Sequence, residues 1–350
     1  MEVLTVNYLD CWDVSANDFP TGCDKLEQIK FLLRYAILAP SNHNTQPWLF
    51  EVRGGEVAII ADRTRTLPVS DPDDRELFIS CGAALFFLET AARAFGFDVS
   101  IRRFPQQHDP DLVAVVEIGK RSTKRSGRPE LFEAITSRRT NRSKFSDNQL
   151  SPASESAIEA ATSANGVRAT WINSRNDRVT LAHLIGLADR AQFEDRAFRK
   201  ELSSWVNPDR ASEPDGLPAK SIGFDSPWNY VAPLLIRTFD LGPGKSRIDE
   251  ALIQSSAAIM VLSTGFDKPI DWVRTGDALA AALLTAESQG VNASYLNQVC
   301  EVEDTRFRLA KIGTVQGYPQ LVLRLGYGIP VAPTPRRPLD SVIRIRADAA

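Results

Sequence analysis

Two long alanine-rich segments, 194 residues apart, constrain the fold of this chain more than any other feature of its sequence. Residues 74–95 and 272–289 have the apolar content of buried helices, and each is followed by a glycine of the kind that ends helices. A shift by 194 residues aligns Gly82, Ala84, Leu85, Ala92, Gly96 and Ser100 with Gly276, Ala278, Leu279, Ala286, Gly290 and Ser294. The match suggests an ancient duplication. The alternative is that two unrelated alanine-rich helices ended by glycine align equally well.

Shorter periodic segments surround each long helix and predict two α+β lobes. In the first lobe we predict a helix and four strands, at Asp24–Ala39, Trp48–Val52, Glu56–Ala61, Val99–Phe104 and Leu112–Ile118. In the second we predict a helix at 152–164 and strands at 167–172, 257–263 and 320–325. The basic, almost wholly polar stretch 120–128 reads as a linker, so we place the lobes at 1–119 and 129–350.

Residues 192–247 interrupt the second lobe between two of its predicted strands. The segment is rich in proline and tryptophan and is too long for a simple connection. Insertions of this kind are often lids or binding loops. We therefore predict a lid, with a solvent-exposed decoration as the alternative.

Composition excludes several classes of function. A net charge of −3 gives no general attraction to nucleic acid or to an anionic membrane, and we predict neither as a partner. The four cysteines form no CxxC pair, and with three histidines they show no metal-ligand spacing. The N-terminus lacks a signal-peptide pattern, so we expect a cytoplasmic protein. No P-loop is present, because Gly244-Lys245-Ser246 lacks the glycine that this motif requires upstream. No GxGxxG dinucleotide motif follows a predicted strand either.

Two polar clusters carry the candidate chemistry. The stretch Arg138–Arg142 concentrates three guanidinium groups and a hydroxyl after a short helix, a composition suited to phosphate. Its alternative interpretation is a solvated basic turn. The loop Pro40–Trp48 places amide and hydroxyl side chains between two prolines, so they are held rigidly enough to recognise a flat heterocycle, although a capped turn uses similar residues.

Together these clusters resemble a known family. APSNHNTQPW at 39–48 is similar to the APSxxNxQPW signature of the nitroreductase family, and RRTNR at 138–142 resembles its RRSxR phosphate motif. The segment Pro333–Asp340 is similar to the family's basic C-terminal segment. The resemblance implies an α+β homodimer with flavin mononucleotide (FMN) at the interface, where each site combines the arginine motif of one subunit with the loop of the other.

The motif order in this chain departs from that family pattern. Ordinary members carry the arginine motif before the loop, whereas here the loop comes about a hundred residues earlier. Residues 1–24 contain no lysine or arginine, and 162–168 do not resemble the loop, so the second copy of each motif is missing. The resemblance to the Acg-type branch therefore implies a pseudo-dimer within one chain, with one FMN. Further oligomerisation is left open.

The resemblance also assigns roles to individual residues. It implies that the phosphate and ribityl chain are bound by Arg138, Arg139, Thr140 and Arg142, helped by Arg336 or Arg337. The opposite side of the flavin would meet Pro40, Ser41, Asn42 and Asn44, and a backbone N–H near Asn297 and Gln298 would approach flavin N5. Family members often have proline where Tyr295 stands, which makes the local stacking an open point.

Three functions follow as hypotheses. The first is an FMN oxidoreductase that passes electrons from NAD(P)H to a small molecule such as a nitroaromatic, quinone or enone, with the flavin supplying the chemistry. No residue is assigned as a catalytic acid or nucleophile. The second is FMN sequestration, with the lid closed over the ring. The third is a duplicated fold that has lost its cofactor. The sequence does not distinguish NADH from NADPH or identify the acceptor.

Overall fold

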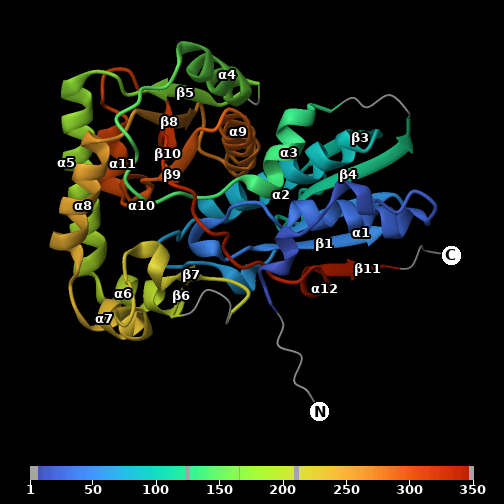
Figure 1. Cartoon of the computed structure of the whole chain (residues 1–350), viewed down its shortest axis with the longest axis horizontal. Coiled ribbons are helices and arrows are strands. Elements are labelled where there is room, and N and C mark those ends of the chain that lie inside the picture. Colours follow the sequence, from blue (N-terminus) through green and yellow to red (C-terminus); the bar gives the residue numbers. More distant parts are fainter. Residues whose placement is uncertain (1–6, 123–126, 165, 209–212, 347–350) are drawn as a thin grey trace.

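The computed structural model describes residues 7–122, 127–164, 166–208 and 213–346. Residues 123–126 of the predicted linker, Asn165 and residues 209–212 of the predicted lid lie outside the described residues, as do both chain ends. Two sheets lie on either side of a central helix pair, α2 (Arg75–Ala94) and α9 (Pro269–Ser288) (Figure 1). The α+β class predicted from the sequence is confirmed.

The two sheets share one strand order. The first runs β11-β1-β2-β4-β3, made of β1 (Trp48–Arg53), β2 (Glu56–Ala61), β3 (Phe97–Arg103), β4 (Leu112–Arg121) and β11 (Ile343–Ile345). The second runs β5-β8-β10-β9, made of β5 (Arg168–Trp171), β8 (Ala258–Thr264), β9 (Asn292–Tyr295) and β10 (Tyr318–Gly326). Without β11, each sheet has its first, second, fourth and third strand in that spatial order, and neighbouring strands are antiparallel.

The close approach of α2 and α9 depends on two glycines. A Cβ added to Gly82 would lie 3.0 Å from Gly276 Cα, and one added to Gly276 would lie 2.8 Å from Gly82 Cα. The contact is reciprocal, because Gly82 also faces the Val273 carbonyl while Gly276 faces the Ile79 carbonyl. Both pairs are related by the same offset of 194 residues. Reciprocity of this kind is the property of an interface with two-fold symmetry.

We expect Gly82→Ala to lower the free energy of unfolding by about 1–3 kcal/mol, because the new methyl group has no space between the helix backbones. Chemical denaturation of the purified variant measures the effect. Gly265→Ala is the matched control, since nothing lies within 4 Å of the position that its Cβ would take. Equal stability of the two variants would contradict the packing argument.

The remaining helices of the lobes pack against the central helix pair, against a sheet or against one another. They are α1 (Lys25–Ala36), α3 (Pro129–Ser137), α4 (Pro152–Ser163), α10 (Gln298–Glu301), α11 (Glu303–Leu309) and α12 (Leu339–Val342). Helix α1 begins where Asp24 accepts a hydrogen bond of 2.9 Å from the backbone N–H of Glu27. Helix α9 begins three residues earlier than its apolar pattern predicts, since Pro269 is tolerated in a first helical turn.

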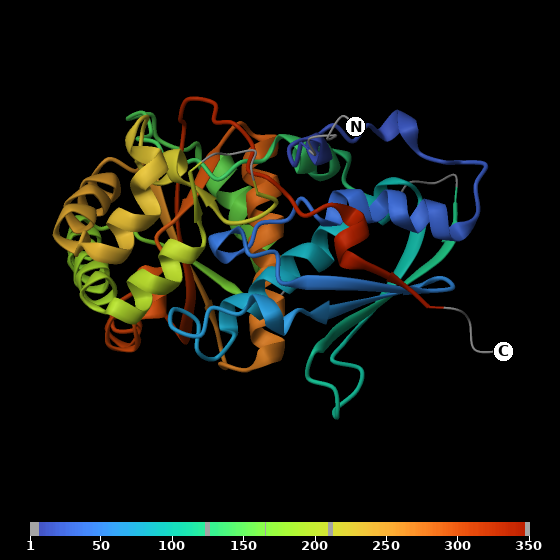
Figure 2. The same cartoon turned by 90° about the horizontal axis from the view of Figure 1, so that it is seen from below.

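The C-terminal segment returns to the first lobe (Figures 1 and 2). Strand β11 pairs in parallel with β1, with Ile343 opposite Phe50, and α12 precedes it. The sequence analysis did not predict this strand. The alternation in Ile343–Ile345 spans only three residues, too short a run to predict a strand, and pairing with the edge of β1 makes it one.

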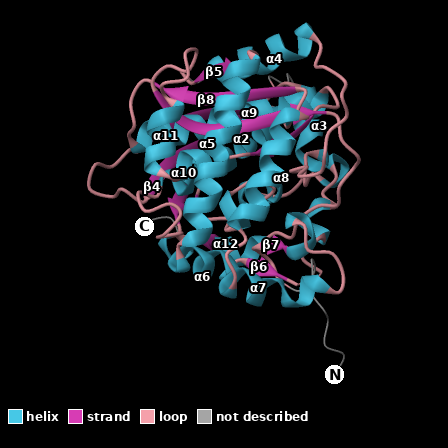
Figure 3. Cartoon of the chain, turned by 90° about the vertical axis from the view of Figure 1, so that its left-hand side faces the viewer, coloured by secondary structure: helices cyan, strands magenta, loops and turns pink. Residues whose placement is uncertain are grey.

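Residues 192–247 form a compact helical insertion. Its elements and their flanking helices are α5 (Arg175–Glu194), α6 (Arg196–Ser204), β6 (Val206–Asn207), β7 (Leu217–Pro218), α7 (Ala232–Thr238) and α8 (Gly242–Gln254). Helices α5 and α8 lie side by side, and α6, α7, β6 and β7 gather at one end of the molecule (Figure 3). The insertion has an apolar core that includes Phe198, Leu202, Leu217 and Ile236.

Helix α2 is long and apolar enough to cross a membrane by length and composition alone. However, 78% of its most apolar window is buried inside the protein. One such helix is what the core of a folded domain requires, and its residues belong to the main apolar cluster between the sheets. The burial accounts for its composition without a bilayer.

Candidate functional site

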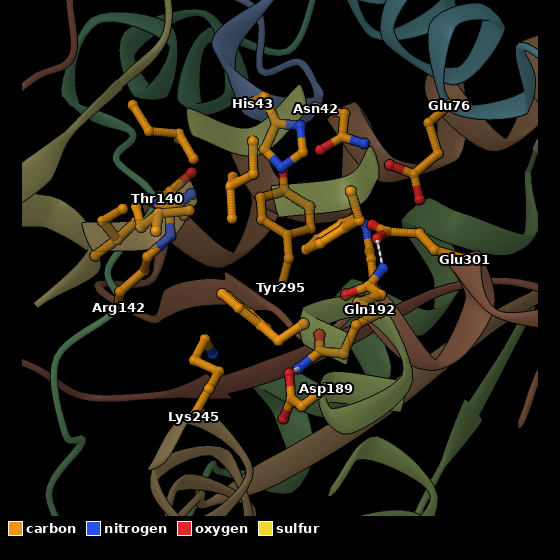
Figure 4. Close-up of a pocket in the computed structure, with 18 of the residues that line it drawn as sticks. Asn42, His43, Glu76, Thr140, Arg142, Asp189, Gln192, Lys245, Tyr295 and Glu301 are labelled. Atoms are coloured by element: carbon orange, nitrogen blue, oxygen red, sulfur yellow. Dashed lines mark hydrogen bonds between the residues drawn. The ribbon is translucent and has the colours of Figure 1, made fainter. Parts of the chain in front are cut away.

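A cavity of about 440 Å³ lies where the two lobes and the insertion meet. Its walls come from the loop after α1, from α2, from the segment after α3, from the end of β9 and from α5, α8 and α10 (Figure 4). Seven of the residues singled out from the sequence line it: Pro40, Ser41, Asn42, Thr140, Arg142, Asn297 and Gln298. The tertiary structure thus brings the two polar clusters to one cavity.

The loop Pro40–Trp48 has an irregular backbone. His43, Asn44 and Gln46 have φ values of 47°, 57° and 51°, in a region that non-glycine residues rarely adopt. The hydroxyl of Ser41 accepts a hydrogen bond of 2.9 Å from the backbone N–H of Gln46, which closes the loop on itself. Local strain of this kind is typical of sites where the surrounding structure fixes a side chain for a purpose.

The loop directs His43 and Asn44 to different surroundings. His43 lines the cavity, and its Nδ1 has no hydrogen-bond partner among the described residues. Burial lowers the pKa of His43 to about 4, and nearby Arg142 contributes, so the imidazole is neutral at pH 7. Asn44 points away from the cavity, with its amide bound to Gly216 O at 3.1 Å and Pro335 O at 3.1 Å.

The arginine cluster follows α3 directly. Arg138 is only 4% exposed, and its Nε and Nη1 have no hydrogen-bond partner in the described parts of the chain. Arg139 lies over the ring of Trp12, 4.1 Å from its centroid, and donates to Thr136 O at 2.8 Å. Burial lowers the pKa of Arg138 and Arg142, and it lowers the pKa of Arg139 to about 10. Buried guanidinium groups without counter-charges favour binding of an anion.

Arg336 and Arg337 do not line the cavity. They hold the Pro40–Trp48 loop in place through hydrogen bonds. Arg336 is buried and donates to Asn44 Oδ1 at 3.0 Å and to Leu38 O at 3.1 Å. Burial, with the nearby charge of Arg138, lowers its pKa to about 9. Arg337 donates to Gln46 O at 3.0 Å. The amide of Gln46 in turn donates to Pro214 O at 2.9 Å, so one network joins the loop, the C-terminal segment and the insertion.

The turn after β9 forms the cavity wall next to α10. The side chain of Asn297 accepts a hydrogen bond of 3.1 Å from the backbone N–H of Val322, which ties the turn to β10. Gln298 donates to Asp189 Oδ1 at 3.1 Å and to Asp249 Oδ2 at 2.7 Å. Tyr295 lines the cavity, and its hydroxyl has no partner among the residues described.

The sequence analysis missed three acidic residues of the cavity. Glu76, Asp189 and Glu301 are on α2, α5 and α10, and Figure 4 shows Glu76 and Glu301 on the opposite side from Thr140 and Arg142. Burial raises the pKa of Asp189 and of Glu301 to about 7, and it raises that of Glu76 well above its usual range. A charged residue in the first turn of a helix resembles a cap, so no sequence signal distinguished Glu76.

The insertion, predicted from the sequence as a lid, contributes much of the apolar wall, although the sequence did not identify which of its residues line the cavity. Its residues that line the cavity are Phe193, Phe198, Leu202, Leu217, Ile222, Phe224, Ile236 and Leu241. The cavity therefore combines a cationic side, an acidic side and an apolar cover. Such a cavity accommodates a flat organic molecule with an anionic group.

We expect Asp189→Asn to stabilise the ligand-free protein by about 1–3 kcal/mol at pH 8, because it removes a buried charge. The native carboxyl has a pKa of about 7 when folded against an ordinary value of 3.8, so its cost develops as the pH rises between these values. The gain should therefore shrink when unfolding is measured at pH 5. Glu194→Gln, an exposed change on the same helix, should be neutral. Equal destabilisation of the Asp189 variant at both pH values would refute this.

Comparison with known proteins identifies relatives of this chain. No family model matches it. It is 32% identical to the uncharacterized protein Rv3127 of Mycobacterium tuberculosis, over 90% of this chain and 93% of that protein. It is 31% identical to Rv3131 of the same organism, named "Putative NAD(P)H nitroreductase", over 91% of both chains. It is 29% identical to the protein named "Putative NAD(P)H nitroreductase acg", over 91% of this chain and 96% of that one.

Among solved structures, the FMN and NADPH-dependent nitroreductase NfnB of Sphigopyxis sp. strain HMH covers 61% of this chain at 18% identity, with a TM-score of 0.39. That TM-score is too low to support an inference about this chain. The family is assigned from the relatives that align over most of their length, such as Rv3131, which is 31% identical over 91% of both chains. The chain belongs to the nitroreductase family.

Proposed function

We propose that this protein is an FMN-dependent oxidoreductase that takes electrons from NAD(P)H and passes them to a small organic acceptor. The observation that carries the proposal is Arg138, a buried guanidinium with unpaired N–H groups among the described residues. It does not itself line the cavity, but its charge acts on Tyr295, which lines the cavity together with Arg142 and residues of the Pro40–Trp48 loop. A flavin phosphate would provide the missing acceptors and charge. The match of both motifs to the nitroreductase signatures supports the choice of flavin.

In this proposal the two lobes hold different parts of one flavin. Arg138, Arg139, Thr140 and Arg142 bind the phosphate and the ribityl chain. Pro40, Ser41 and Asn42 contact the ring from the other lobe, and the unpartnered Asn42 Nδ2 is free among the described residues to donate to it. The turn at Asn297 and Gln298 would present a backbone N–H to the ring, since the Asn297 side chain already fixes that turn to β10.

Asn44, Arg336 and Arg337 have a supporting part in the proposal. Their hydrogen bonds hold the loop, the C-terminal segment and the insertion together. These three residues would then affect flavin affinity indirectly, by holding the Pro40–Trp48 loop in position. When bound, the flavin supplies hydride transfer. The neutral His43 and the apolar insertion would exclude water from the reacting face and admit a flat acceptor such as a nitroaromatic, quinone or enone.

The proposal includes one flavin per chain in a pseudo-dimer formed by tandem duplication, with lobes at 1–119 and 129–350. The reciprocal contact of Gly82 and Gly276 and the shared strand order of the two sheets support the duplication. The absence of lysine and arginine from residues 1–24 supports a single site. A stoichiometry of two FMN per chain would refute this part.

Two measurements test the function. The absorbance spectrum of the purified protein should show bound flavin, and a chain that stays colourless after incubation with FMN has no such cofactor. The flavin-loaded protein should then oxidise NADH or NADPH steadily when para-nitrobenzoate is present. Bound flavin without consumption of either reductant would reject the enzymatic role but not the cofactor.

FMN sequestration is the second candidate, and a specific observation favours it. The insertion is hydrogen-bonded to the loop through Gly216 and Pro214, and Glu201 accepts hydrogen bonds of 2.9 Å from the backbone N–H groups of Val69 and Ser70. A cover fastened at two places would slow the exchange of both flavin and substrate. Flavin that dithionite reduces but NAD(P)H does not would support storage, whereas steady turnover would exclude it.

A further inference from the structure

The acidic side of the cavity has no part in the proposed binding of flavin phosphate. Asp189 on α5 and Glu301 on α10 both line the cavity, and neither forms an ion pair with a described residue. Each accepts a hydrogen bond from a neutral amide: Gln298 donates to Asp189 Oδ1 at 3.1 Å, and Gln192 donates to Glu301 Oε2 at 2.6 Å. Neutral amides satisfy one oxygen without neutralising the charge, on which Lys245 and Arg75 act without forming an ion pair with either acid.

Asp189 has one carboxylate oxygen that accepts no hydrogen bond from a described residue. The residue is only 2% exposed, and its Oδ2 has no hydrogen-bond partner in the described ranges. Its carboxylate lies at the cavity wall in Figure 4, between Gln192 and Lys245. A buried carboxylate oxygen without a donor costs free energy that a ligand donor would recover.

The nearest basic side chains are engaged elsewhere. Lys245 forms an ion pair with Asp249, and Arg75 donates to Glu76 Oε1 at 3.1 Å and to Cys300 O at 3.3 Å. A metal ion does not suit these acids, because within the described residues no group of three or more His, Cys, Asp or Glu side chains is arranged to hold one. An organic cation, with several N–H donors and an apolar stem, matches both the two carboxylates and the apolar wall beside them.

We infer that Asp189 and Glu301 form a subsite for the cationic group of the electron acceptor, so that this protein prefers acceptors that carry an ammonium or amidinium group. The inference rests on the proposed function, since it takes the ligand of the subsite to be the molecule that the flavin reduces. The guanidinium groups and the carboxylates then bind opposite charges at different places in the same cavity. Neutral acceptors of the same shape bind more weakly.

The charges around each carboxylate set the pH at which the subsite works. Lys245, Asp249 and Glu301 surround Asp189, and burial raises its pKa to about 7. Burial also raises the pKa of Glu301 to about 7, and Arg75, Asp71, Glu76 and Glu201 are the charged groups around it. Both acids are therefore mostly ionised at pH 8 and protonated at pH 5, whereas a benzylammonium group is charged at pH 5 and still mostly charged at pH 8. Preference for a cation should disappear at the lower pH.

The experiment compares para-nitrobenzylamine with para-nitrobenzyl alcohol, which share the ring and the nitro group. Calorimetric titration of the oxidised, FMN-loaded protein without reductant measures binding apart from activity. We expect the amine to bind about ten-fold more tightly than the alcohol at pH 8, with release of protons near pH 7, and about equally at pH 5. Asp189→Asn should abolish the difference at pH 8, and Glu301→Gln should reduce it.

Glu194→Gln is the matched control, because it removes an exposed acidic charge from the same helix without changing the cavity. Equal affinity of the two ligands at pH 8 overturns the inference, and so does a preference that Asp189→Asn and Glu194→Gln lower to the same extent. Both outcomes leave FMN binding intact, so they are distinguishable from failure of the proposed function. If no FMN binds, the same titration of the flavin-free protein decides the subsite alone.

Discussion

Replacement of Arg138 by alanine is expected to weaken FMN binding by about 100-fold, the equivalent of about 3 kcal/mol. The guanidinium is buried and has two nitrogens without partners among the described residues, so its charge and its donors are available to a phosphate. Fluorescence titration of FMN into the flavin-free protein measures the change. The same substitution should stabilise the flavin-free protein, because it removes a buried charge that nothing else compensates.

The opposite directions of the two effects separate ligand binding from a structural role. A structural arginine would lower stability when removed, with or without FMN. Arg138→Lys should recover only part of the affinity, since an ammonium group keeps the charge but not the two-pronged geometry of the guanidinium. Arg128→Ala, at the exposed start of α3, is the control and should leave the affinity unchanged. Unaltered FMN affinity in Arg138→Ala would refute the phosphate-binding role.

Deletion of the insertion is expected to speed the release of FMN by at least about ten-fold and to raise the rate of NAD(P)H oxidation. The apolar wall that covers the cavity comes from this segment, and its hydrogen bonds to the Pro40–Trp48 loop keep it in place. Residues 195–241 can be replaced by a short glycine–serine linker, because Gly242 lies against Arg190 and Phe193 where the two flanking helices meet. Stopped-flow release of FMN and steady-state assays measure the two rates.

A milder variant checks that the deletion acts by opening the cavity. Glu201→Gln weakens the hydrogen bonds to residues 69 and 70 without removing any residue that lines the cavity, and it should accelerate FMN release by a smaller factor. The amount of bound FMN at saturation should be unchanged in both variants. If the deletion leaves release and turnover at the level of the intact chain, the insertion does not control access.

The secondary structure was largely predictable from the sequence where local patterns were strong. The central helices were expected at 74–95 and 272–289 and are observed at Arg75–Ala94 and Pro269–Ser288, since both have long apolar stretches and glycine stops. Strand β8 was expected at 257–263 and is observed at Ala258–Thr264, because a continuous β-prone apolar run of this length belongs inside a sheet. Strand β11 was missed, since only its pairing with β1 defines it.

The candidate site was predictable only in part. The loop at Pro40–Trp48 and the arginines at Arg138–Arg142 could be identified because each concentrates rare residue types in a short stretch. Asp189 and Glu301 could not, since isolated acidic residues on helices look like solvent-exposed ones until packing buries them. The same holds for the apolar wall of the insertion, whose residues read as an ordinary helical core.

The sequence by itself determined the class of fold, the long helices and the two motifs that relate this chain to the nitroreductases. Those features depend on local periodicity and on composition within a few residues, which a linear chain displays directly. Only the tertiary structure decided that residues of the two motifs line one cavity, that Asn44 and Arg336 hold the loop in place, and that acidic residues from three helices line the same cavity. Burial and contact between distant segments arise on folding, and they convert ordinary polar side chains into a site with separate cationic and acidic sides.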